Sequence, residues 1–246
     1  MSYEISPYIW HTNKERRRMR KINLLYIRFH DALRSNELEM FRGAVLSKLS
    51  GDSTLFHNHV GENFRYSYPL IQYKRLFGKA AIVCLEEGTE AIGKLFAAGD
   101  FTFRIGERVV RMGIESLYPR QALVRVWDAA FTYQLYRWLP FNEENFQAYQ
   151  RMEGLAERYD FLERKLTGNI LSFAKGVGIH FDERITCKIL EAEEPYWILY
   201  KGVRMKTFNV RFKTNVSLPE HIGLGKGASL GHGIIHSVKK SLDNDG

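Results

Sequence analysis

Hydrophobic residues recur along this chain with two spacings, one typical of strands and one typical of helices. Residues 22–29 are rich in Ile, Leu, Tyr and Phe and predict a strand. A helix is predicted to begin at Asn36-Glu37 and to end at Ser50-Gly51-Asp52. It is indicated by apolar residues at three- and four-residue spacing: Leu38, Phe41, Val45 and Leu49.

The rest of the first half continues this alternation of elements. Gly99 is expected to end a helix over 86–98, and strands are predicted on both sides of it, at 64–74, 80–85, 101–105, 109–114 and 122–126. The resulting order is strand, helix, strand, strand, helix, strand. This is the split βαβ pattern of a ferredoxin-like domain.

The second half repeats the order less cleanly. Strand-like sequence at 122–139 ends at Pro140, and two helical patterns follow, at 143–152 and 155–173. Later strands are predicted at 185–191, 197–200, 203–213 and 234–238, with Lys201-Gly202 as a tight turn. We therefore expect an α+β protein of two tandem ferredoxin-like (RRM-like) domains with antiparallel sheets. The expected divisions are a basic segment at 1–21, domains at 22–120 and 121–238, and a tail at 239–246.

A glycine-rich loop over 223–233 separates the last two predicted strands. Glycine lets the main chain approach a ligand closely, and successive N–H groups beside a lysine can bind phosphate. Lys226 is followed by Gly227 rather than Ser or Thr, which excludes a P-loop, and too few residues follow Gly233 for a Rossmann unit. The remaining readings are an anion-binding loop and a flexible connector. The candidate contacts are Gly223, Gly225, Lys226, Gly227, Ser229, Gly231, His232 and Gly233.

The charge composition of the chain indicates a negatively charged partner. The chain of 246 residues has 36 Lys and Arg against 28 Asp and Glu, a net charge of +8, which suits RNA, DNA or an anionic membrane surface. Aromatic residues make up 13% and offer stacking platforms for unpaired bases. The two cysteines form no CxxC pair, so no Cys-based zinc site is suggested. No secretory leader or long apolar run is evident, and the expectation is a soluble cytoplasmic protein without a membrane partner.

Two stretches in this order resemble a known family. They are Gly223-Leu224-Gly225 with Gly231-His232-Gly233, and the segment 68–74 that follows a pair of histidines. Together they are similar to the CRISPR-associated repeat-processing endoribonucleases, the Cas-six family of the RAMP superfamily, and the paired histidines resemble its subtype-I-B branch. The resemblance extends from about residue 22 to residue 238.

The resemblance implies cleavage of CRISPR precursor RNA within each repeat, without metal or other cofactor. The 2′-hydroxyl attacks the neighbouring phosphate and leaves a 2′,3′-cyclic phosphate and a 5′-hydroxyl. In that family the glycine-rich loop lies against RNA, and a histidine near the first helix acts as base or acid. CRISPR repeat RNA is thus the expected partner, and other effector-complex subunits and a second copy of the chain are further candidates.

This chemistry needs a base, an acid and positive charge beside the phosphate. His57 and His59 suit the first two roles because the ordinary pKa of imidazole is near neutral. They are two residues apart, so on extended backbone they share a face, and which is base and which is acid stays open. Arg65, Lys74 and Lys79 are the candidate sources of positive charge, and a solvated strand face is the alternative interpretation of these residues.

Other interpretations remain open. His57 and His59 are also compatible with two surface histidines, or with a zinc site completed by His30 or His180. His30 is a second candidate for catalysis. An RNA-binding protein of the same fold that grips a repeat hairpin without cutting is the main alternative function, and a DNA-binding accessory protein is a weaker one.

Overall fold

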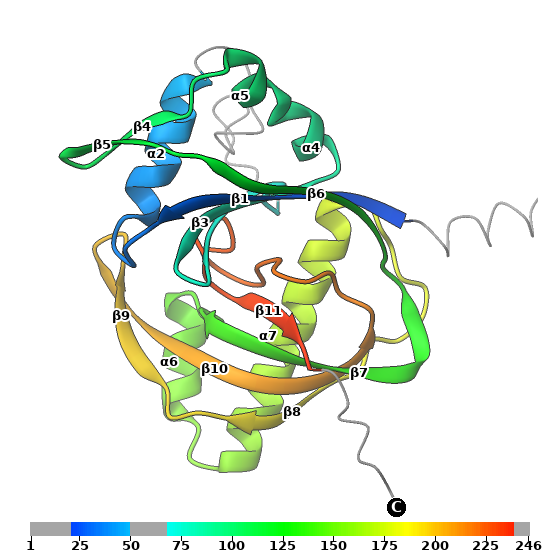
Figure 1. Ribbon diagram of the computed structural model, residues 1–246. Helices are drawn as coiled ribbons and strands as arrows, with labels where there is room; N and C mark the ends of the chain where they lie inside the picture. Colours follow the sequence, from blue (N-terminus) through cyan, green and yellow to red (C-terminus); the bar gives the residue numbers. More distant parts are fainter. Residues whose placement is uncertain (1–20, 50–67, 239–246) are drawn as a thin grey trace, which may run out of the picture.

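The computed structural model describes residues 21–49 and 68–238, and within them the chain forms two large antiparallel sheets and a two-stranded one (Figure 1). The first sheet has the order β2-β3-β1-β6. Its strands are β1 (Lys21–Ala32), β2 (Ile71–Leu76), β3 (Lys79–Leu85) and β6 (Ile114–Leu123). The first strand therefore lies between the third and the fourth, which is the ferredoxin-like arrangement expected from the sequence.

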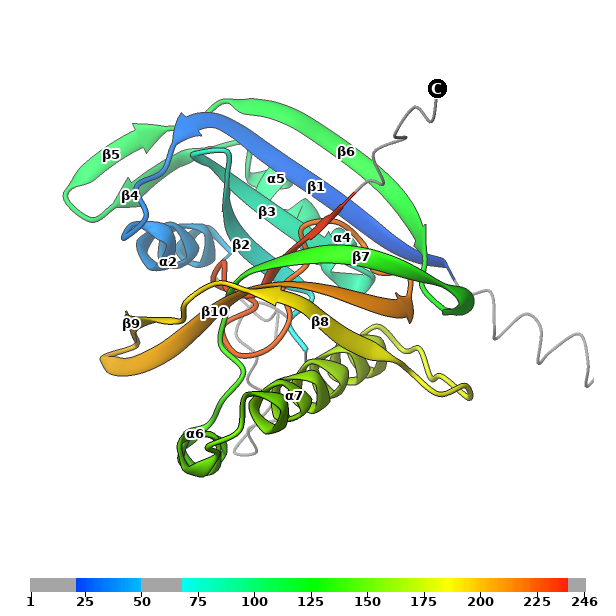
Figure 2. The same cartoon turned by 90° about the horizontal axis from the view of Figure 1, so that it is seen from below.

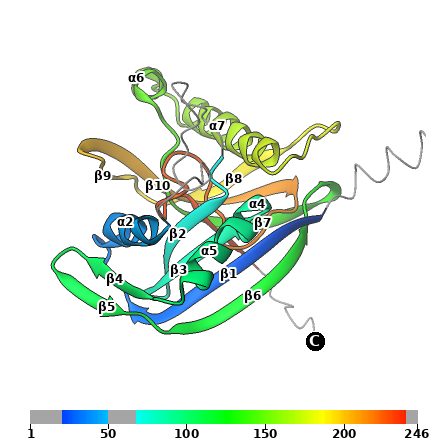
Figure 3. The same ribbon diagram turned by 90° about the horizontal axis from the view of Figure 1, so that it is seen from above.

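Three helices cover one face of this sheet (Figure 3). They are α2 (Leu38–Lys48), α4 (Glu87–Ala91) and α5 (Gly93–Ala98). The single helix predicted over 86–98 is thus divided at Ile92, in a segment whose two glycines have low helix propensity. The strands predicted near 101–114 form a separate hairpin, β4 (Thr102–Ile105) with β5 (Arg108–Arg111).

The second sheet repeats the topology of the first, in the order β11-β7-β10-β8. Its strands are β7 (Val126–Trp138), β8 (Cys187–Ala192), β9 (Tyr196–Tyr200), β10 (Val203–Val216) and β11 (Ile234–Ser237). The two helices of this half are α6 (Glu143–Arg151) and α7 (Leu155–Gly176), which lie between β7 and β8 in the sequence. Strand β9 pairs with β10 alone, through the predicted turn. Lys201 and Gly202 have φ of 49° and 78°, and positive φ at both positions is typical of a type I′ hairpin turn.

The second half lacks a helix between β10 and β11. A complete ferredoxin-like unit has its second helix there, whereas this chain has the glycine-rich segment. In Figure 1 this orange-to-red segment lies between the two sheets, and Figure 2 shows α7 on the side of the second sheet away from the first. A stretch that looks like a connector in the sequence therefore occupies the space between the domains.

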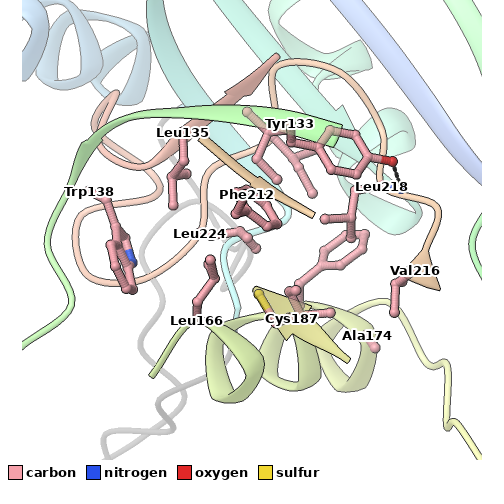
Figure 4. Close-up of a cluster of buried hydrophobic side chains, with 14 of the residues drawn as sticks. Tyr133, Leu135, Trp138, Leu166, Ala174, Cys187, Phe212, Val216, Leu218 and Leu224 are labelled. Atoms are coloured by element: carbon pink, nitrogen blue, oxygen red, sulfur yellow. Dashed lines mark hydrogen bonds between the residues drawn. The ribbon is translucent and has the colours of Figure 1, made fainter. Parts of the chain in front are cut away.

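The core explains why β1 and β3 are apolar on both faces. Ile27 and Phe29 of β1 pack under α2, whereas Ile22 and Leu24 face the opposite way, because side chains alternate along a strand. Ile22 and Leu24 belong to one apolar cluster with side chains of the second sheet and of α7. The buried side chains of α7 recur at helical spacing. Figure 4 shows part of this cluster, in which Leu224 of the glycine-rich loop lies among Leu135, Leu166 and Phe212.

Among the described residues, no helix is both long and apolar enough to cross a membrane.

Candidate functional site around the glycine-rich loop

The glycine-rich loop, residues 223–233, is closed by its own backbone. The Leu224 N–H donates to the Gly233 carbonyl at 2.8 Å, and the Gly233 N–H donates to the Arg137 carbonyl at 3.1 Å. The Lys226 N–H donates to the carbonyl oxygen of Leu139 at 3.2 Å. The loop is therefore fastened to the end of β7, and most of its residues are buried or half-buried.

Two of its glycines are required by the space around them. Gly233 has φ of 62°, and a Cβ there would lie 1.9 Å from the Leu224 carbonyl oxygen. Gly225 has φ of 82°, and a Cβ there would lie 2.9 Å from Nε1 of Trp138. Both positions combine a left-handed backbone with a close neighbour, so only glycine fits without displacement. These two glycines are therefore needed for the packing of the loop, whether or not the loop binds a ligand.

Strand β2 of the first domain holds the other side of the loop. The Tyr73 N–H donates to the Ser229 carbonyl at 2.9 Å, and Tyr73 forms a parallel bridge with Leu230. The Gly223 N–H donates to Oε1 of Gln72 at 2.9 Å, which fixes the beginning of the loop. Because β2 is an edge strand, these contacts occupy backbone groups that an uncovered edge would expose.

Lys74 has a different position from the one that the sequence suggested. Its side chain is fully buried, and Nζ donates to the Ala228 carbonyl at 2.9 Å. Burial lowers the pKa of Lys74 to about 7, since the charged form is poorly solvated there. The expected phosphate contact is replaced by an internal one, because the loop covers the face of β2 that alternation would leave to solvent. Lys74 holds the loop in place.

His232 is also turned inward. It is 6% exposed, its ring meets Tyr200 edge-on at 5.1 Å between centroids, and it packs against Gly227. Burial, helped by the charge of Arg137, lowers the pKa of His232 to about 4, so the imidazole is neutral at pH 7. It supplies no positive charge to a ligand. Tyr68 and Tyr73, two of the aromatic residues that could offer stacking platforms, are also buried.

The accessible part of the loop is short and lies among cationic residues. Lys226 is exposed, and Gly225, Gly227 and Ser229 are half-buried. Arg137 lies near His232, on whose pKa its charge acts. Burial raises the pKa of Tyr200, and the charges of Glu39 and Arg42 on α2 act on the same phenol. We call Lys226 of the loop, Arg137 near His232 and Arg42 of α2 the basic surface around the loop. Of these three residues the sequence pointed only to Lys226.

The expected catalytic residues His57 and His59, and Arg65 with them, lie outside the described residues. The chain on both sides of them is anchored beside the loop. Before them, Leu38 of α2 contacts Gly231, where a Cβ would lie 2.7 Å from Cδ2 of Leu38. After them, the Tyr68 hydroxyl donates to the Gly223 carbonyl at 2.8 Å.

The structure adds contacts that sequence reasoning missed. Gln72 and Tyr68 fix the start of the loop from about 150 residues away along the chain, and no local signal pairs them with it. One group in the described part of the chain brings together three possible metal ligands: Glu220, His221 and His236. Neither His30 nor His180, the expected third ligands of a zinc site, belongs to it, and both are exposed.

Comparison with known proteins gives matches over both halves. A model of the Cas6b N-terminal domain matches residues 20–122, and a model of the Cas6b C-terminal domain matches residues 125–238. The uncharacterized protein MJ0978 of Methanocaldococcus jannaschii is 30% identical over 103 residues, which are 42% of this chain and 69% of that protein.

Solved structures show the same fold. A crystal structure of Cas6b has a TM-score of 0.81 and 23% identity, over 89% of this chain and 100% of that chain. A second, of the CRISPR RNA processing endoribonuclease Cas6b, has a TM-score of 0.69 and 22% identity over the same shares. Csf5, a type IV CRISPR-Cas Cas6 crRNA endonuclease, has a TM-score of 0.56 and 12% identity, again over 89% and 100%. Because models of both domains of one family match in order, this chain belongs to the Cas6b family, as the glycine and histidine motifs indicated.

Proposed function

We propose that this protein is an endoribonuclease that cleaves CRISPR precursor RNA within its repeats, without a metal ion. Membership of the Cas6b family over both domains is the observation that carries the proposal. The fold is shared with structures described as a CRISPR RNA processing endoribonuclease and a crRNA endonuclease. The net charge of +8 agrees with a polyanionic substrate.

The reaction that we propose is attack by the RNA on itself. A neutral imidazole, of His57 or His59, takes the proton of the 2′-hydroxyl, and that oxygen forms a bond to the adjacent phosphorus. The bond from phosphorus to the 5′ oxygen breaks, and the other imidazole, protonated, gives its proton to this leaving oxygen. The products are a 2′,3′-cyclic phosphate and a 5′-hydroxyl. Positive charge from Arg65 stabilises the phosphate as its charge grows.

The basic surface around the glycine-rich loop is the proposed binding site for the repeat. Lys226 is exposed, Arg137 lies at the end of β7 near His232, and the charge of Arg42 on α2 acts on Tyr200, whose ring meets His232. Helix α2 precedes the segment that carries His57 and His59, and Tyr68, whose hydroxyl donates to the Gly223 carbonyl, follows it. The chain on both sides of that segment is therefore attached beside the loop that would hold the RNA. Lys74 contributes by holding the loop, through its hydrogen bond to Ala228.

The test uses labelled repeat RNA in EDTA, beside a copy with one 2′-deoxy substitution at the cleavage position. We expect discrete cleavage of the first RNA and none of the second. His57→Ala and His59→Ala should each lose cleavage and keep affinity for the RNA. Tight binding without cleavage by the unmodified protein would overturn the catalytic proposal and leave an RNA-binding protein. Absence of binding to any repeat RNA would overturn the catalytic proposal and the RNA-binding alternative.

Other effector-complex subunits and a second copy of the chain are further partners that we propose from the family resemblance. Light scattering of the purified protein with and without repeat RNA tests the second of these partners. A mass of two chains without RNA would support a homodimer. A mass of one chain in both conditions would contradict it.

A further inference from the structure

Three side chains with metal-binding atoms meet beside the start of the glycine-rich loop. Glu220 and His221 directly precede the loop, and His236 lies on β11. Each offers one ligand atom, and these atoms all lie within 4.8 Å of one another. The two imidazole rings have centroids 4.8 Å apart and an interplanar angle of 70°. Two imidazoles and one carboxylate are a common ligand set for zinc.

The backbone brings these residues together. The His221 N–H donates to the Ile235 carbonyl at 2.9 Å, and the Ile235 N–H donates to the Ile222 carbonyl at 3.0 Å. The Ser237 N–H donates to Oε1 of Glu220 at 2.8 Å, which orients the carboxylate and leaves its other oxygen for a ligand. A site on rigid, paired segments is better organised for binding than one on a free loop.

His221 has two unfavourable features. Its backbone has φ of 62°, a left-handed conformation that non-glycine residues adopt at a cost. Its Nδ1 is buried, and among the described residues it has no hydrogen-bond partner. A buried polar atom without a partner is unfavourable, and a bound cation would provide one.

The charges around the three residues act in both directions. The charge of Glu220 favours a cation, and those of Lys74 and Arg28 oppose it.

We propose that Glu220, His221 and His236 form a site for Zn²⁺ beside a cavity of about 260 Å³ that Glu220 and His221 also line. That cavity is lined by Tyr26 and Phe77 of the first domain together with Glu220 and His221. Both aromatic rings meet His221 edge-on, at 6.1 and 6.4 Å between centroids. The ion fastens the entry of the glycine-rich loop to β11, at the junction of the two domains. This role is separate from cleavage.

The experiment measures binding of zinc alone to the full chain after removal of bound metal by a chelator. We expect about one zinc per chain by competition with a chromophoric indicator, and a higher melting temperature with zinc. His236→Gln and Glu220→Gln should weaken binding by more than about tenfold. His221→Asn should do the same, and asparagine tolerates the left-handed backbone. The double variant His57→Gln/His59→Gln is the matched control, because it removes the other candidate histidine pair and should keep the zinc.

Zinc binding that disappears in the His57/His59 control and persists in His236→Gln would overturn the site, as would no binding by the unmodified protein. Far-UV circular dichroism checks the folding of each variant. If the variants do not fold, X-ray absorption of the zinc-loaded unmodified protein decides: two imidazoles and a carboxylate support the site, and any other ligand set contradicts it. No RNA is needed, so the result is independent of cleavage.

Discussion

The Tyr68 hydroxyl donates a hydrogen bond of 2.8 Å to the carbonyl oxygen of Gly223 and joins the first domain to the start of the glycine-rich loop. The same hydroxyl accepts a hydrogen bond from Nε2 of Gln72 at 2.9 Å, and Oε1 of Gln72 accepts the Gly223 N–H. All three residues are buried, so water cannot replace a missing partner. Two side chains thus satisfy both backbone groups of one glycine.

Tyr68→Phe removes the hydroxyl from this closed set of hydrogen bonds. The Gly223 carbonyl then loses its donor, and Nε2 of Gln72 retains only its bond to the Pro69 carbonyl. We expect the free energy of unfolding to fall by about 1–3 kcal/mol, the usual cost of a buried polar group without its partner. Urea unfolding measures it. Tyr118→Phe is the control, because Tyr118 is exposed and should change stability little. Equal effects of the two substitutions would contradict the anchoring role.

Gly233→Ala tests the packing of the loop. The new Cβ would lie 1.9 Å from the Leu224 carbonyl oxygen on a backbone with φ of 62°. We expect a loss of at least about 3 kcal/mol in unfolding free energy, or failure to fold. Gly168→Ala is the matched control. Gly168 lies within α7, and a Cβ there would have no atom within 4 Å. Alanine at this position should stabilise the helix by roughly 0.5–1 kcal/mol. Thermal unfolding of both variants measures the contrast, and similar melting temperatures would contradict it.

Much of this architecture was predictable from the sequence because it depends on local signals. Apolar spacing predicted α2, and Lys201-Gly202 predicted the turn between β9 and β10. The position of Lys74 was not predictable. Alternation along β2 assigns one face to solvent, but Ile71, Gln72, Tyr73 and Lys74 are all buried, because a loop about 150 residues later covers that face. His221 and His236 meet for a similar reason, since only the return of the chain along β11 brings them together.

Lys74→Met tests the burial of a lysine. Its pKa is about 7 in the folded protein and 10.5 ordinarily, so between these pH values the unfolded chain binds more protons. The cost of burying Lys74 is therefore complete below pH 7 and decreases as the pH rises. Between pH 7 and pH 9 it should decrease by roughly 3 kcal/mol, at about 1.4 kcal/mol per pH unit.

Methionine should remove this pH dependence. The measurement is urea unfolding of both proteins at pH 7, 8 and 9, with their difference in free energy plotted against pH. Lys226→Met is the control, because Lys226 is exposed and its replacement should leave the slope unchanged. A difference that does not vary with pH would show that Lys74 is not buried as described.

Lys226→Ala and Arg42→Ala test the basic surface as the binding site for RNA. Each variant should bind repeat RNA about three- to tenfold more weakly at low salt, because a cation near the phosphates is lost. Each should also reduce the slope of log affinity against log salt by roughly 0.7 to 0.9, the value for one released counterion. Filter binding at several salt concentrations measures both quantities.

Lys94→Ala is the control. Lys94 is exposed on α5, one of the helices that cover the first sheet, and it is not part of the basic surface around the loop. If Lys94→Ala weakens binding as much as Lys226→Ala does, the protein attracts RNA through its net charge and the loop is not the site.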